Sequence, residues 1–245
     1  MEVVNDFRKK VLSNINKVLD GKVALFNFLD ENEASILEDI CEREKIPYYK
    51  YGGIEDSSRN RYILSNYEVE DEDFKISVYE IKYNKRYYDI EHKHVLGTLM
   101  SLGIKREVVG DIVIDEKKNI YFACTNEISK FILSELEFIN RAKVELEKVD
   151  HIVKNIIKYE EKEILVSSYR LDSIISGVYN ISRNKSLEII KEGLVYVNHI
   201  NNMNVSHMVK IGDEINVRHF GKFTVDRFMN VTRSNRLKIV VLIRR

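Results

Sequence analysis

The stretch that most constrains the fold lies at residues 169–222, where two short helical patterns precede a strand, a polar loop and a second strand. Leu171, Ile174 and Ile175 recur at helical spacing, and Gly193 ends the second helical pattern. We therefore expect a helix pair packed on a small sheet. Cations gather at the start of the second helix and on the loops, which is the arrangement that a phosphate-binding surface needs.

Charge is divided unevenly along the chain, although basic and acidic residues balance at 39 each overall. Residues 165–245 contain 13 Lys and Arg against 6 Asp and Glu, a net charge of +7. Residues 1–164 hold the remaining 26 and 33, a net charge of −7. This asymmetry indicates an anionic partner for the basic part. An acidic membrane surface fits less well than nucleic acid, because the residues after 193 are strand-like and supply no basic amphipathic helix.

Length and composition favour an ordered protein of two or three units. No apolar run approaches the roughly 20 residues that span a bilayer. The first residues, MEVVNDFRKK, lack the pattern of a secretory signal. Cys41 and Cys124 are too few for a disulfide framework and indicate a reducing compartment, so we expect a cytoplasmic protein.

An α+β fold is expected, beginning with an N-terminal α/β unit over residues 1–73. Apolar residues recur at helical spacing over 3–19, and a strand is expected at 23–28. Asp30 and Glu33 form a capping box for a second helix. Two further strands are predicted at 48–51 and 61–64.

Residues 74–150 follow the order βαββαβ, which is typical of a ferredoxin-like, RRM-like plait. The predicted elements are, in order, a strand at 75–83, a helix at 94–102, a hairpin of 108–114 and 120–124, a helix at 126–136 and a strand at 142–146. Such plaits often bind RNA through aromatic residues on the open sheet face. Tyr79 and Tyr83 are the candidates on the first strand, with half-buried sheet residues as the alternative.

A charged connecting segment is expected at 151–164, followed by the basic domain at 165–245. Ser182 is the predicted cap of the second helix of the basic domain. Arg183 and Lys185 occupy its first turn, where the helix dipole disfavours cations. A phosphate bound at the same place would offset that cost.

Four strings within the basic domain carry a family resemblance: R-L-D-x-x-I, S-R-x-K, I-I-K-E-G-x-V-x-V-N and V-x-x-G-D-x-I-x-V-R. They resemble the RNA-binding domain named after small-subunit ribosomal protein S-four, also called the alpha-L motif. His199 departs from the pattern, because many members have glycine after the asparagine. That difference leaves the geometry of the turn open.

The preceding strings FNFLDENEASILEDI, YGGIEDSSRNRYIL and HKHVLGTLMSLGIKREVVGDIVID resemble the YlmH family. The resemblance implies an N-terminal region, a plait and an S-four-type domain. It also implies RNA binding on the large ribosomal subunit carrying stalled peptidyl-tRNA, in ribosome-associated quality control, and a link to cell division.

Carried onto this sequence, the resemblance implies RNA-contacting residues on the helix pair and on the sheet with its loops. They are Arg170, Ser182, Arg183, Asn184, Lys185, Lys191, Asn198, His199, Lys210, Arg218 and Lys222. Secondary RNA contacts are considered at Lys105, Arg106, Arg59 and Arg61, each of which has a purely structural alternative. For Phe220 two roles stay open, stacking on an unpaired base and packing in the core or a turn.

Catalysis is the competing interpretation of the basic domain. The triplet Arg170-Leu171-Asp172 resembles the catalytic motif of pseudouridine synthases, but the 73 residues after Asp172 form the expected RNA-binding fold. No phosphate-binding loop or dinucleotide fingerprint occurs, and His92 with His94 lacks further ligands at metal-binding spacing.

We therefore expect a non-enzyme without cofactor or metal. The resemblance implies ribosomal RNA and the large ribosomal subunit as partners, with peptidyl-tRNA and a protein bound by the acidic units as further candidates. The alternatives are an adaptor in cell division whose main partner is a protein, or an RNA-modifying enzyme.

Overall fold

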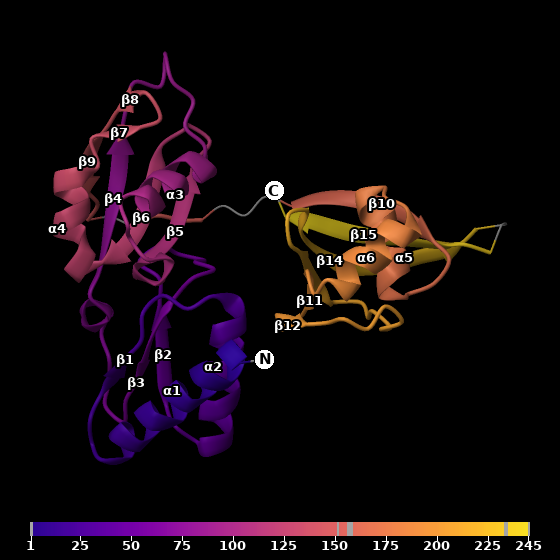
Figure 1. The fold of residues 1–245 in the computed structure, drawn as a ribbon, viewed down its shortest axis with the longest axis horizontal. Coiled ribbons are helices and arrows are strands. Elements are labelled where there is room, and N and C mark those ends of the chain that lie inside the picture. Colours follow the sequence, from indigo (N-terminus) through magenta and orange to yellow (C-terminus); the bar gives the residue numbers. More distant parts are fainter. Residues whose placement is uncertain (1, 151, 156–158, 233–234, 245) are drawn as a thin grey trace. The chain divides into compact units, whose positions relative to one another are not determined.

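The fold combines helices with antiparallel sheets, as the sequence predicts. The computed structural model describes residues 2–150, 152–155, 159–232 and 235–244. They form two compact units, unit 1 over residues 1–156 and unit 2 over residues 157–245 (Figure 1). No helix within the described ranges has the length and apolar character needed to cross a membrane.

The first part of unit 1 packs two helices against a three-stranded sheet. Val11 and Ile15 of the first helix contact Leu37 of the second in one apolar core. The capping box is confirmed, because the Glu33 amide donates to Asp30 at 2.9 Å and the Asp30 amide donates to Glu33 at 3.1 Å. The elements are α1 (Glu2–Leu19), β1 (Ala24–Leu25), α2 (Glu31–Glu44), β2 (Tyr48–Tyr51) and β3 (Arg61–Leu64), with strand order β1-β3-β2.

The second part of unit 1 is a four-stranded antiparallel sheet with strand order β5-β6-β4-β9. Val95 and Leu99 of α3 and Ile132 of α4 pack on one face of that sheet. The elements are η1 (Asp71–Phe74), β4 (Ile76–Lys82), α3 (His92–Ser101), η2 (Arg106–Val108), β5 (Val109–Ile114), β6 (Ile120–Thr125), α4 (Asn126–Glu135), β7 (Phe138–Ile139), β8 (Ala142–Lys143) and β9 (Glu145–Lys148).

The two faces of this sheet differ in what covers them. Tyr79 is 5% exposed and stacks on Phe122 at 5.8 Å in the core under the helices, so the RNA-stacking alternative is wrong for Tyr79. On the opposite face, Phe28 and Ile54 from the first part pack against Val113 of β5. A shared apolar cluster therefore joins both parts into unit 1.

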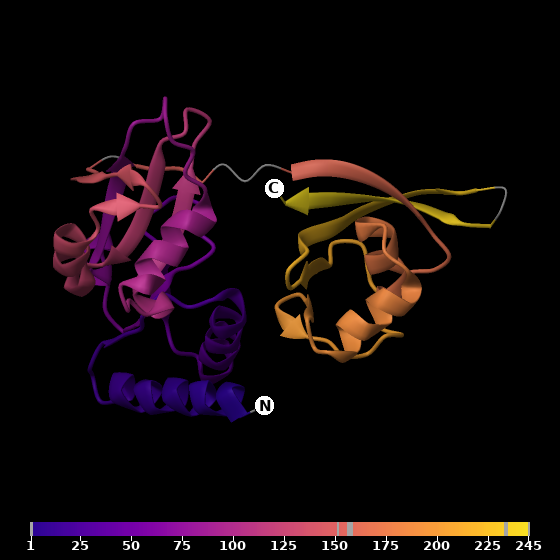
Figure 2. The same cartoon turned by 45° about the horizontal axis from the view of Figure 1, so that its top comes forward.

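Unit 2 places α5 and α6 against one face of a six-stranded sheet (Figure 2). Ile174 of α5 and Ile189 of α6 share a core with Val195, Ile215 and Val241 of the strands. The elements are β10 (Tyr159–Val166), α5 (Leu171–Tyr179), α6 (Arg183–Lys191), β11 (Val195–Val197), β12 (Ile200–Asn201), β13 (Glu214–Val217), β14 (Gly221–Val231) and β15 (Leu237–Arg244), with strand order β10-β15-β14-β13-β11-β12.

The expected connecting segment 151–164 differs from the structure at its end. Residues from Tyr159 onward belong to β10, which pairs along its whole length with β15, from Tyr159 opposite Arg244 to Val166 opposite Leu237. Only 152–155 of the segment is otherwise described, and there the Glu55 amide donates to the Val153 carbonyl at 2.8 Å within unit 1. The other proposed domain boundaries stay predictions.

Candidate nucleic-acid interface

The starts of α5 and α6 form the centre of the candidate interface in unit 2. Asn180 ends α5 in the left-handed conformation, with φ 54°, and the chain turns into α6 within three residues. The buried faces of both helices hold them on the sheet, so the polar side chains at 182–185 are exposed. The Ser182 side chain accepts from the Lys185 amide at 3.1 Å, which confirms the predicted cap.

Asp172 connects the starts of the two helices. Its side chain is 3% exposed, accepts from Arg170 Nε at 3.0 Å and accepts from Arg183 Nη2 at 2.6 Å. Ser186 Oγ, which is fully buried, donates to the Asp172 carbonyl at 2.9 Å. The side chains of Arg170 and Arg183 stay 37% and 49% exposed. One buried carboxylate thus fixes two guanidinium groups whose remaining donors are open to a ligand.

The charge state of Asp172 follows from these contacts. Burial by itself raises the pKa of this carboxyl group, whereas the hydrogen bonds from Arg170 and Arg183 lower it, and the net pKa lies below the usual value. Asp172 is therefore ionised at neutral pH. Asp172 lies in the first turn of α5, and its main contacts are the two arginines.

The cations in the first turn of α6 have partners within the protein. Asp172 compensates the charge of Arg183, and Lys185 Nζ lies 3.1 Å from Glu188 Oε2. The second pair is more than half exposed on both sides, so it contributes at most about 1 kcal/mol. The contact with Asp172 therefore explains why Arg183 is tolerated at a position that the helix dipole disfavours. The weak pair with Glu188 holds Lys185 only loosely.

Asp213 organises a second group of candidates at one end of the sheet. The Asn198 side chain donates to Asp213 Oδ1 at 2.9 Å and accepts from the Glu214 amide at 2.9 Å. The Lys210 amide donates to Asp213 Oδ2 at 2.7 Å, while the Lys210 side chain is exposed. Asn198 is thus committed to holding the loop, and Lys210 remains available to a ligand.

His199 and Lys222 approach the same carboxylate next to this loop. His199 Nδ1 lies 3.8 Å and Lys222 Nζ 3.9 Å from Glu214 Oε1. Asn198 and His199 both have positive φ, 47° and 66°, and link β11 to β12 as a two-residue turn. The structure therefore gives the turn geometry that the sequence left open.

A backbone ladder joins the two groups. The Leu171 amide donates to the His207 carbonyl and the Val209 amide donates to the Tyr169 carbonyl, both at 2.9 Å. Arg170 pairs with Met208 across this ladder. Since Lys210 follows Val209 directly, this pairing ties the loop that carries Lys210 to the start of α5.

Lys191 and Arg218 make none of these acid-centred contacts in the described structure. Lys191 lies in the last turn of α6, where the helix dipole favours a cation. The Arg218 guanidinium lies 5.2 Å from the centre of the Tyr196 ring, a cation–π contact. The ring of Phe220 lies 5.2 Å from the ring of Tyr179, and the residue is 41% exposed, so the packing contact leaves part of Phe220 accessible.

The secondary candidates lie in unit 1 and are mostly structural. Arg61 is 3% exposed and donates to the carbonyl groups of Phe26 and Phe74 at 3.0 and 2.7 Å. An RNA contact at Arg61 is therefore wrong, because its guanidinium is buried and used by the backbone. Arg59 donates to the Phe28 carbonyl at 2.9 Å, and its amide donates to Asp111.

Lys105 and Arg106 behave differently from each other. Lys105 is exposed, whereas Arg106 donates to the carbonyl groups of Val109 and Gly110. Burial lowers the pKa of Arg106 to about 10. The purely structural alternative thus describes Arg106, and Lys105 stays a predicted RNA contact.

Sequence reasoning missed the acids that position the candidate cations. Asp172, Asp213 and Glu214 each contact two residues of the predicted set. Asp172 lies two positions from Arg170 in the sequence, which is a usable signal, but Arg183 is eleven positions away. Only the fold brings that second arginine into contact.

Comparisons with known proteins add to this geometry. Residues 69–152 match the family model described as "Putative RNA-binding domain in YlmH". The matched segment runs from just before η1 to just after β9, so it covers the four-stranded sheet of unit 1 and its helices.

Similarity to one curated relative extends over nearly the whole chain. The chain is 28% identical over 250 residues to "Ribosome-associated protein quality control protein P2" of Bacillus subtilis (strain 168), with 97% of each chain covered. Among solved structures, "Cell division protein ylmH from Streptococcus pneumoniae" matches with a TM-score of 0.52 and 27% identity, over 59% of this chain and 90% of that chain.

Proposed function

We propose that this chain is a non-enzymatic, cytoplasmic RNA-binding protein that acts in ribosome-associated quality control. Its ligand is ribosomal RNA of the large subunit, with peptidyl-tRNA as a further candidate ligand. The similarity along 97% of the chain to a protein named for ribosome-associated quality control supports the process. The match of residues 69–152 to an RNA-binding family model supports the ligand class.

Two fold assignments belong to this proposal. The order βαββαβ and the strand order β5-β6-β4-β9 support a ferredoxin-like plait in unit 1. The helix pair α5–α6, followed by β11 and β13, supports an S-four-type domain in unit 2. The family strings at 169–222 fall on these same elements.

The observation that carries the proposal is the pair of arginines held by Asp172. Both guanidinium groups are partly exposed at the starts of two helices, and each keeps donors that Asp172 does not use. Arginine forks fixed in this way suit phosphate oxygens, because their order is established before the ligand binds. The surrounding unit carries a net charge of +7 over 165–245.

Charge reversal beside this pair tests the proposal. Replacing Arg183 by Glu would place a second carboxylate next to the buried Asp172, so Asn184→Glu with Lys185→Glu is the better double variant. We expect it to abolish co-sedimentation with ribosomes while the protein stays folded. Asn16→Glu with Lys9→Glu makes the same change of charge at exposed positions of unit 1 outside residues 69–152, and is the matched control. Retained co-sedimentation of the first variant moves the RNA site elsewhere.

An adaptor role in cell division is the second candidate function, supported by the similarity to the streptococcal cell division protein. In that case the main partner is a protein, and RNA binding is secondary. Treating a cell extract with ribonuclease before pull-down separates the two functions. Partners that persist after treatment favour the adaptor, whereas loss of all partners favours the RNA-binding protein.

A further inference from the structure

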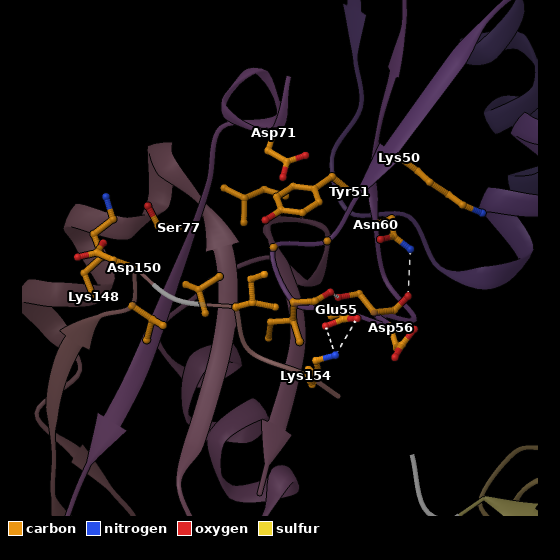
Figure 3. Close-up of a pocket in the computed structure, with 18 residues that line it drawn as sticks. Lys50, Tyr51, Glu55, Asp56, Asn60, Asp71, Ser77, Lys148, Asp150 and Lys154 are labelled. Atoms are coloured by element: carbon orange, nitrogen blue, oxygen red, sulfur yellow. Dashed lines mark hydrogen bonds and ion pairs between the residues drawn. The ribbon is translucent and has the colours of Figure 1, made fainter. Parts of the chain in front are cut away.

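Unit 1 contains an open pocket on the sheet face that α3 and α4 do not cover. Its volume is about 810 Å³, and its lining comes from β2 with the following loop, from the start of β4, and from the residues after β9 (Figure 3). Gly53, with φ +77°, lies so close to the sheet that an added Cβ would be 2.6 Å from Ile76 and 3.0 Å from Val78. The loop is thus held tightly against the sheet and shapes one side of the pocket.

The interior of the pocket is apolar. Ile54, Ile76 and Val78 belong to the apolar cluster on this sheet face and line the pocket. Ile152 contributes a side chain that is 78% exposed, and the ring of Tyr51 packs 5.7 Å from Phe74 at the upper edge (Figure 3). Covering such a surface with one aliphatic or aromatic side chain releases water and favours binding.

The rim of the pocket is acidic once its internal ion pairs are considered. Lys154 Nζ lies 3.0 Å from Glu55, and Lys50 points away from the pocket to Glu38 at 2.9 Å. Asp71 lies at the upper edge of the pocket near Tyr51, and Asp150 lies at the left edge (Figure 3). Neither forms an ion pair with any residue in the described part of the chain.

Further acids extend this rim. Asp71 begins the run Asp71–Phe74, whose first three residues are acidic and exposed. Burial, followed by the nearby carboxylates of Asp71 and Glu72, raises the pKa of Tyr51, which agrees with a negative potential at this edge. Asp56 adds another exposed carboxylate to the lining. Of the three lysines in the lining, Lys148 is the one that forms no ion pair with a described residue. A polyanion is disfavoured here.

We propose that this pocket binds a basic peptide segment of a partner protein, with one apolar side chain of the segment inserted between Tyr51 and Ile152. Lysine or arginine residues on either side of that anchor reach Asp71 and Asp150. This combination of an apolar anchor and a charged rim is a common arrangement for protein recognition. The site lies in unit 1 and is independent of the RNA surface proposed for unit 2.

Fluorescence anisotropy with the full-length chain tests this inference. The probe is a fluorescein-labelled nonapeptide with four lysines on each side of a central phenylalanine. We expect the serine analogue of the central residue to bind at least about tenfold more weakly, because burial of a phenylalanine side chain is lost. An analogue with glutamates in place of the lysines should not bind.

Two pairs of variants locate the site. Asp71→Lys with Asp150→Lys should weaken binding by at least about tenfold, whereas Glu44→Lys with Glu135→Lys makes the same change of charge at exposed helix ends and should not. Ile152→Ser should weaken binding several-fold, with Leu133→Ser, also exposed, as its control. All of these positions are on the surface, and circular dichroism verifies that the variants are folded.

Several results would overturn the inference. They are equal binding by the rim variant and its control, equal binding of the phenylalanine and serine peptides, and no binding up to millimolar peptide. A separate titration with a 20-nucleotide single-stranded RNA, monitored by amide NMR, tests whether the pocket binds nucleic acid. Shifts at Gly53 and Val78 with RNA alone would assign the pocket to nucleic acid instead.

Discussion

Individual acidic residues explain how the basic surface of unit 2 is organised. Asp172 is nearly fully buried, yet it contacts two arginines that remain accessible. Without it, two neighbouring guanidinium groups would repel each other and sample many rotamers. The acid lowers the net charge of the unit by one but fixes the positions of two cations.

Replacing Asp172 by Asn tests this role. The variant keeps the size of the side chain and removes the charge that holds Arg170 and Arg183. We expect a loss of about 2 kcal/mol in the free energy of unfolding, in the range of hydrogen bonds to charged groups. We also expect RNA affinity to fall several-fold despite the more positive net charge. Higher affinity would show that net charge matters more than placement.

The stability difference should depend on pH. The pKa of Asp172 is lowered in the folded protein, so its contribution is present above the unfolded pKa of about 3.9 and is lost as pH falls through the folded pKa. The wild-type protein and Asp172→Asn should therefore differ most at neutral pH and converge on acidification. Urea unfolding between pH 7 and pH 2 measures this. A constant difference across that range would contradict the assignment of the charged form.

His199 lies in a turn whose backbone suits glycine. With φ 66° it follows Asn198, also at positive φ, and asparagine–glycine is the favoured pair for such two-residue hairpin turns. We expect His199→Gly to stabilise the protein by roughly 0.5–1 kcal/mol, since the left-handed conformation disfavours a Cβ. If the same variant loses RNA affinity, the imidazole contacts the ligand; unchanged affinity would assign His199 to the turn alone.

Among the elements of the fold, the start of α6 allows stability to be separated from binding. Ser182 caps this helix, so Ser182→Ala should cost about 1 kcal/mol in thermal or urea unfolding. Asp is an equally good cap and is favoured by the helix dipole, so Ser182→Asp should keep the stability of the wild-type protein. Its added negative charge should nevertheless weaken RNA binding. Equal RNA affinity for Ser182→Asp and the wild-type protein would mean that no phosphate lies at this helix start.

Helix boundaries were the most predictable part of the fold because their signals are local. Asp30 and Glu33 specify the beginning of α2 within four residues, and Ser182 does the same for α6. The helix predicted at 126–136 begins at Asn126 as α4, with Thr125 as its N-cap residue. The boundaries of these helices can thus be predicted from residues close to them in the sequence.

Strands formed by distant pairing were less predictable. In β10 the residues 159–163 contain three glutamates and a lysine, which hides the strand in a charged sequence. The strand becomes stable only through its pairing with β15, more than 70 residues later. The charged residues that make β10 hard to predict form ion pairs with β15, such as Lys238 Nζ with Glu163 Oε2 at 2.7 Å.

The same limit applies to the candidate site. Arg61 and Arg183 both read as accessible cations, but Arg61 is enclosed by the carbonyl groups of Phe26 and Phe74. Arg183 instead meets Asp172 and keeps half of its side chain exposed. Sequence reveals the residue types of a site, whereas burial depends on segments that are distant in sequence.

Across the whole molecule, the division of charge predicts how binding responds to salt. Unit 2 supplies most of the cations proposed to contact RNA. Neutralising about 5 phosphates should give a slope of about −3.5 to −4.5 in log affinity against log salt concentration. The acidic residues of unit 1 should not alter this slope, because only released counterions determine it. Measuring RNA affinity between about 50 and 300 mM salt tests the number of phosphates that are neutralised.

A double variant extends this measurement from the slope to the residues that produce it. Lys185 and Lys210 have exposed side chains in the two groups of the candidate interface. Because each phosphate contact contributes about 0.7 to 0.9 to the slope, Lys185→Ala with Lys210→Ala should make it shallower by about 1.4 to 1.8. Lys9→Ala with Lys22→Ala, at exposed positions of unit 1 outside residues 69–152, should leave the slope unchanged. If both double variants shift the slope equally, RNA is bound by general charge, and the arrangement around Asp172 and Asp213 does not select the contacts.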